Sequence, residues 1–214
     1  MLKTTITLLL VAILALAFTA CGLSQRPYPL VRTYTLEQPD LAGAMDQALS
    51  KRPKAVVIVT ASPPPSAYDG KKLVYKQKPH ELAPDFYNEF YAPPTRAIAD
   101  SLAKYLDMNS PKLQIVRFQG ASSPDYSLEV GIMDLYGDYT VSPPVLRLTV
   151  TTTMNDLRRS VTKVVFANRY VKTPPLVTKG DEDRPETLVR TITEALAELY
   201  PSILADTESA ASGR

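Results

Sequence analysis

The second half of the chain constrains the fold most, because strand patterns follow one another there with no helical stripe between them. Four segments are rich in β-branched and aromatic residues, namely 112–119, 126–139, 145–154 and 160–171. Gly131 is a candidate β-bulge in the second of these, and Asn-Asp-Leu-Arg at 155–158 indicates a hairpin turn between the last two. We therefore expect consecutive strands of one sheet here.

Three segments of the first half also have strand patterns. Residues 30–38 alternate between two faces until Pro39 ends the pattern. Residues 55–61 form a continuous β-branched run, which indicates a central strand buried on both faces. Residues 72–77 follow a proline-rich connection and indicate a more exposed strand.

Amphipathic stripes predict three helices, and prolines mark their boundaries. The first begins after the candidate N-cap Asp40 and ends before Pro53. The second has Pro94 in its first turn and the third has Pro185 there, where proline is favoured. The third helix has the clearest apolar stripe of the chain, made by Leu188, Val189, Ile192, Ala195, Leu196, Leu199 and Tyr200.

The predicted order is β-α-β-β-α-β-β-β-β-α. Three helices are too few to cover both faces of such a sheet, which indicates an α+β fold with the helices packed on one face. We expect a mostly antiparallel mixed sheet in a single domain over residues 30–204, followed by a disordered tail at 205–214.

The only cysteine of the 214 residues, Cys21, excludes an internal disulfide and a multi-cysteine zinc site. It follows a positive start at Lys3 and an uncharged apolar run, and it stands between the small residues Ala20 and Gly22. A basic end, an apolar region and a small-residue cleavage point are the layout of a secretory signal.

Three interpretations of this segment are open. It is a retained membrane-spanning helix, an ordinary signal cut after Ala17, or a lipoprotein signal cut before Cys21 with the cysteine then acylated. Phe-Thr-Ala-Cys resembles the bacterial lipobox, which favours the third, with a signal at 1–20 and a lipidated tether at 21–29. Gly22 after the cysteine, in place of aspartate, resembles an outer-membrane address.

The chain offers little material for catalysis or for nucleic-acid binding. A net charge of +2 without a long basic run gives no phosphate-tracking groove. His80, the only histidine, lies in a proline-flanked loop and is interpreted as a solvated residue. Asp134 and Asp138 could share one face of a strand, and solvated surface carboxylates are the simpler account. We therefore expect no active site, no metal and no cofactor.

An aromatic cluster precedes the second helix, at Phe86, Tyr87, Phe90 and Tyr91. One interpretation is that most of these side chains pack the start of the helix onto the sheet. The other is a partner-contact surface, because tyrosine combines apolar area with a polar tip.

The sequence resembles the ABC-type transport auxiliary lipoproteins, the paraquat-inducible protein C-like group. The resemblance rests on Leu73-Val74-Tyr75, the aromatic segment, the pair Pro93-Pro94 and the helix after it, and it runs from about Cys21 to Leu204. The family often has a tryptophan just before the proline pair, where this chain has Phe90-Tyr91.

This resemblance implies an outer-membrane lipoprotein that faces the periplasm and is not an enzyme. Such a protein docks the conduit of a transporter that is built on a mammalian-cell-entry (MCE) domain protein and moves lipids between the two membranes. The resemblance is also compatible with homo-oligomers. Two other functions compete with this one. An activator of a peptidoglycan synthase would favour a longer tether than residues 21–29, and a periplasmic hydrolase would need a catalytic constellation.

Overall fold

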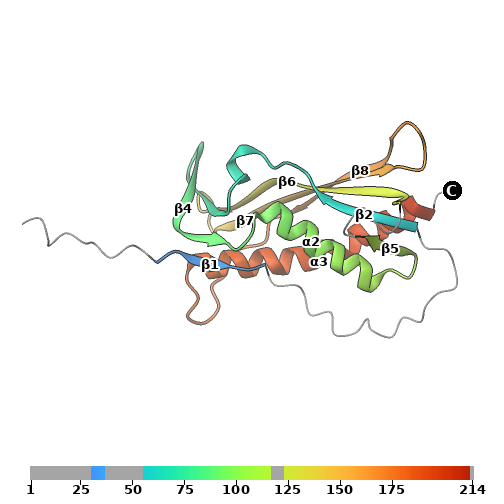
Figure 1. The fold of residues 1–214 in the computed structure, drawn as a ribbon. Coiled ribbons are helices and arrows are strands. Elements are labelled where there is room, and N and C mark those ends of the chain that lie inside the picture. Colours follow the sequence, from blue (N-terminus) through green and yellow to red (C-terminus); the bar gives the residue numbers. More distant parts are fainter. Residues whose placement is uncertain (1–29, 37–54, 117–122, 213–214) are drawn as a thin grey trace, which may run out of the picture. The chain divides into compact units, whose positions relative to one another are not determined.

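A computed structural model describes residues 30–36, 55–116 and 123–212, and the described residues from Val31 onward belong to one compact unit. The described residues form an eight-stranded mixed sheet, two α-helices and one short 3-10 helix (Figure 1). The strands are β1 (Arg32–Tyr34), β2 (Ala55–Ala61), β3 (Lys72–Lys78), β4 (Glu81–Phe90), β5 (Leu113–Val116), β6 (Tyr126–Asp138), β7 (Val145–Asp156) and β8 (Lys163–Lys172). The helices are η1 (Ser66–Tyr68), α2 (Pro94–Asn109) and α3 (Arg184–Ser212). The helix expected after Asp40 lies outside the described residues.

Strand β6 organises the sheet, because three strands pair with it. Strand β7 runs antiparallel along one of its edges. The other edge pairs in parallel with β2 over Tyr126–Val130 and with β3 at Gly137–Asp138. One branch continues from β2 to β5, and the other continues from β3 through β4 to β1. The sheet therefore forks at β6, and η1, which follows β2 in the chain, contacts β3.

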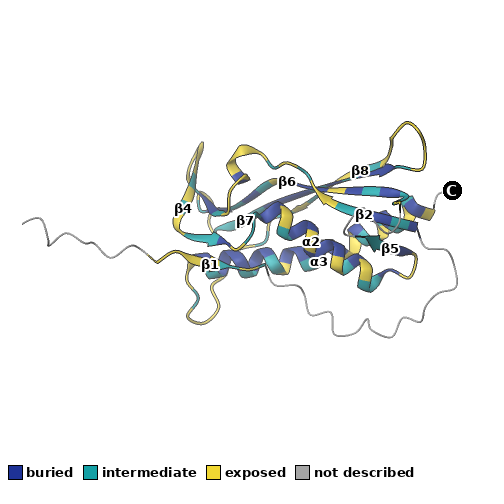
Figure 2. Ribbon diagram, viewed as in Figure 1, coloured by how far each residue is buried: buried dark blue, intermediate teal, exposed yellow. Residues whose placement is uncertain are grey.

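Both α-helices lie on the same face of this sheet (Figure 1). Helix α2 packs on β2, β5 and β6, and α3 packs on β7 and β8. The two helices also contact each other, with the ring centroids of Tyr105 and Tyr200 5.4 Å apart. Both helices contain many buried residues, which are dark blue in Figure 2. The predicted α+β class with a mixed sheet and helices on one face is confirmed.

Helix α3 is eight residues longer than the sequence analysis expected. It continues through residues 205–212, which were predicted as a disordered tail. The buried stripe goes on in this last section, because Ile203, Thr207 and Ala211 recur at intervals of four and are all buried. The Thr207 hydroxyl also donates to the Ile203 carbonyl at 2.7 Å.

Two further boundaries differ from the prediction. The β7–β8 turn begins later than expected, because Asn155 and Asp156 still pair with β8. The β-bulge in β6 lies at Met133, where the register with β7 shifts, and not at Gly131. Gly131 has another role, since a Cβ atom there would lie 2.8 Å from the Thr151 hydroxyl oxygen. A side chain at this position would therefore force the Thr151 side chain to move.

Candidate functional site

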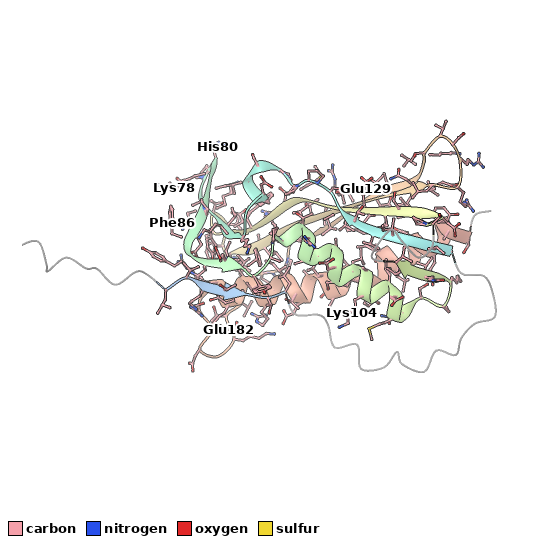
Figure 3. The ribbon with its side chains drawn as sticks, in the orientation of Figure 1. Lys78, His80, Phe86, Lys104, Glu129 and Glu182 are labelled. Carbon is pink, nitrogen blue, oxygen red and sulfur yellow. The ribbon has the colours of Figure 1, made fainter. Side chains whose placement is uncertain are left out.

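His80, the histidine that the sequence analysis considered for catalysis, lies in an exposed turn. His80 is exposed in the two-residue turn between β3 and β4, at the tip of the hairpin (Figure 3). Its φ of 65° is a left-handed conformation that histidine tolerates better than most residues. Among the described residues, no group of three metal-ligating side chains comes together.

Asp134 and Asp138 share one face of β6 as predicted, since both line one hollow of about 300 Å³ with Tyr136 and Arg147. Asp138 is not a solvated surface carboxylate, however, because only 3% of it is exposed. Burial alone would raise the pKa of this carboxyl. The hydrogen bonds from Thr140 and the ion pair with Arg147 at 3.1 Å have the larger, opposite effect, so the pKa of Asp138 is lowered. Asp138 is therefore an ionised structural residue.

The most unusual local geometry is a large bulge in β4. Val74 of β3 pairs with Pro84 of β4, and Lys72 pairs with Glu89. Leu73, the single residue between Lys72 and Val74, therefore lies opposite four residues of β4, 85–88. We call these four residues the aromatic bulge. Bulges of this kind interrupt the ladder and redirect side chains.

Asp85 holds the aromatic bulge in shape. Its Oδ1 accepts hydrogen bonds from the backbone N–H groups of Tyr87 at 2.8 Å and Asn88 at 3.0 Å. Its Oδ2 accepts a third from the Asn88 side-chain amide at 2.9 Å. Aspartate commonly satisfies backbone donors in turns in this way. The three bonds fix the backbone on both sides of Phe86.

The bulge separates the four predicted aromatic residues into two groups. Phe86 and Tyr87 are 75% and 56% exposed, and Tyr91, just after the strand, is 70% exposed. The Phe86 side chain points away from the domain (Figure 3). Phe90 is only 3% exposed and belongs to the hydrophobic core. The interpretation that most of these residues pack a helix start onto the sheet is wrong, because only Phe90 of the four is buried.

A hollow of about 420 Å³ borders the aromatic bulge. One wall consists of bulge residues with Tyr75 and Pro84, and the other consists of Asp183, Arg184 and Pro185 at the start of α3. Phe86 and Tyr87 therefore stand beside a recess, an arrangement that suits anchoring contacts at a protein interface.

Strand β1 ties this region to α3. Its pairing with β4 begins at Asn88, the last bulge residue. Arg32 of β1 forms ion pairs with Asp183 and Glu186 at the helix start. Partial burial alone would raise the pKa of Asp183. The hydrogen bond from Arg32 acts in the opposite direction, and the pKa of Asp183 is lowered overall. The aromatic bulge therefore adjoins a region in which ion pairs connect β1 to the start of α3.

The sequence of the chain, including this region, matches a known protein family. The family model of the ABC-type transport auxiliary lipoprotein component matches residues 34–203, which include β4, the bulge and most of α3. The chain belongs to this family. Members of this family are auxiliary components of ABC-type transport systems. No curated protein matches the sequence.

Three solved structures share the fold of this auxiliary component. A Xanthomonas campestris protein assigned to DUF330 has a TM-score of 0.62 at 17% identity, covering 85% of this chain and 93% of its own. An uncharacterised protein has a TM-score of 0.61 at 13% identity, covering 83% and 99%. A hypothetical protein of Chlamydia trachomatis has a TM-score of 0.51 at 10% identity, covering 76% and 100%. At these identities the likeness shows the fold alone.

The anchor predicted at Cys21, with the signal at 1–20 and the tether at 21–29, lies outside the described residues. Within the described part of the auxiliary component, neither α-helix has the length and apolar character to cross a bilayer.

Proposed function

We propose that this auxiliary component is an outer-membrane lipoprotein, anchored through acylated Cys21, that docks an MCE-domain conduit protein of a lipid transport system on the periplasmic side. The observation that carries the proposal is the family match over residues 34–203. The lipobox-like sequence before Cys21 supports it independently, because it comes from residues outside the matched range. In this role the chain has no catalytic step and needs no cofactor.

The contact surface that we propose consists of Phe86, Tyr87 and Tyr91. Exposed aromatic side chains dominate the binding energy of many interfaces, especially beside a recess. Asp85 already accepts hydrogen bonds from the backbone N–H groups of Tyr87 and of the neighbouring Asn88, so that binding would order little additional chain. Phe90 belongs to the same aromatic cluster but is not part of this contact surface, because it is buried.

Changing Phe86 and Tyr87 to serine is expected to abolish capture of the conduit protein from cross-linked native membranes. An aromatic anchor contributes about 2 kcal/mol or more, which corresponds to roughly a thirtyfold loss of affinity. Capture is measured by mass spectrometry of the partners that co-purify with the full-length protein. Since both side chains are largely exposed, the thermal midpoint should stay within a few degrees of the unaltered protein.

The matched controls are Met133→Ser and Val161→Ser, which also remove exposed apolar side chains but on β6 and in the β7–β8 hairpin. Both should capture the conduit protein normally. Undiminished capture by the Phe86→Ser, Tyr87→Ser variant would contradict the assigned contact surface. Recovery of a cell-wall synthase, with no transport component, would contradict the function itself.

A further inference from the structure

We infer that the free edge of β8 binds an extended acidic segment of another protein, which adds to the sheet as a further strand. This inference concerns a different surface from the aromatic bulge and stands independently of the proposed conduit contact. In Figure 1, the β7–β8 hairpin lies at the opposite end of the domain from β4.

Strand β8 has the longest regular free edge of the described sheet, because the outer edge of β4 that β1 leaves unpaired is interrupted by the aromatic bulge. The other two edge strands are β1 and β5, with three and four residues, whereas β8 has ten and pairs only with β7 among the described strands. The register with β7 is unbroken from Phe166 to Lys172. An edge of this length presents a row of backbone donors and acceptors to an incoming strand.

The side chains of β8 leave that edge open. Val164 and Val171 are 54% and 57% exposed, and Ala167 between them is exposed and small. Proteins usually protect an edge by shortening it, by charging it densely or by covering it. Because the exposed side chains of Val164, Ala167 and Val171 are apolar and short, an extended chain can approach the β8 backbone closely.

One face of β8 is tied to α3 by side-chain contacts. The Tyr170 hydroxyl donates to Asp206 at 2.6 Å, and the Asn168 amide donates to the same carboxylate at 2.8 Å. The Lys172 ammonium pairs with Glu198 at 2.6 Å. Burial and then the neighbouring Asp206 raise the pKa of Tyr170 to about 12, so its hydroxyl stays a donor at neutral pH. A fixed strand loses little conformational freedom when a partner strand adds to it.

Charge identifies the partner as acidic. Residues 157–180 contain six lysines and arginines and no aspartate or glutamate. Carboxylates of neighbouring segments engage four of the six, as shown by the ion pairs of Arg158, Arg159, Lys172 and Lys179. Lys163 and Arg169 on β8 have no ion-pair partner among the described residues. A second copy paired through the same edge would bring cations against cations, which opposes self-association.

The test uses the full-length protein in detergent and a fluorescent nine-residue peptide of alternating glutamate and valine. We expect saturable binding by fluorescence anisotropy and slower hydrogen exchange of the β8 amides in its presence. A peptide with the same sequence but N-methylated at alternate residues lacks half of the backbone donors and should bind at least about tenfold more weakly. A lysine–valine peptide should not bind.

Arg169→Glu should weaken binding of the glutamate–valine peptide at least about tenfold, since two like charges then face each other. The matched control Lys104→Glu makes the same change on α2 and should alter it less than twofold; Lys104 is exposed and labelled in Figure 3. Equal binding of the N-methylated peptide would overturn strand addition. Dimer formation that protects β8 without any peptide would assign the edge to a second copy and overturn the acidic partner.

Discussion

Replacing Cys21 with serine is expected to move the protein almost completely from the membrane fraction to the soluble periplasmic fraction. Burial of acyl chains contributes about 0.8 kcal/mol per methylene, so that one chain binds marginally and several chains bind stably. Serine has no thiol to acylate, so the substitution removes all of the acyl chains together. Membrane fractionation, with the mass of the N-terminal peptide, measures both the location and the modification.

A matched control is Ser24→Ala, which makes an equally small change in the tether and leaves Cys21 in place. This variant should remain in the membrane. A Cys21→Ser protein that stays in the pellet and resists alkaline extraction would contradict acylation and indicate a retained membrane-spanning helix. An unaltered protein that is itself soluble would indicate an ordinary signal cut after Ala17.

The second large effect concerns stability. Phe90→Ala is expected to lower the free energy of unfolding by about 3–5 kcal/mol, the usual cost of removing a buried phenylalanine. Phe90 is buried in the core, and its backbone N–H donates to the Lys71 carbonyl at 2.6 Å. It also pairs with Tyr34 at the end of β1, so a cavity here would loosen the attachment of β1.

Urea denaturation followed by circular dichroism measures this effect through the shift of the midpoint at constant slope. The control is the adjacent Tyr91→Ala, which should change the free energy of unfolding by less than about 0.5 kcal/mol because the side chain is exposed. If Phe90→Ala does not fold, Phe90→Leu retains most of the volume and should fold with a smaller loss. Equal losses for Tyr91→Ala and Phe90→Ala would contradict the division of the aromatic cluster.

The elements that local sequence determines were predicted well. The β-branched run of β2 and the long pattern of β6 gave strands, and Pro94 and Pro185 marked helix starts, because these signals depend only on near neighbours. Strand β4 was missed, since Pro84 removes a donor and Asp85 favours a turn. The fork at β6 depends on pairing between distant segments, which no local pattern contains.

The candidate site was predicted as a cluster, but not which of its members are exposed. Simple alternation along a strand would place Phe86 and Phe90 on the same face. The four-residue bulge breaks this alternation, so that Phe86 is exposed and Phe90 is buried. Asp138 was misjudged for a related reason: its partner Arg147 lies on the next strand. Both errors come from contacts between strands.

The most direct test of the proposed docking role is site-specific photo-cross-linking in native membranes, with benzoylphenylalanine introduced at position 86 of the full-length protein. The same residue at position 133, on β6, serves as the control. Our account predicts a cross-link from position 86 to an MCE-domain conduit protein and none to that protein from position 133. A cross-link to the conduit from position 133 alone, or no conduit cross-link from either position, would contradict the assigned docking surface.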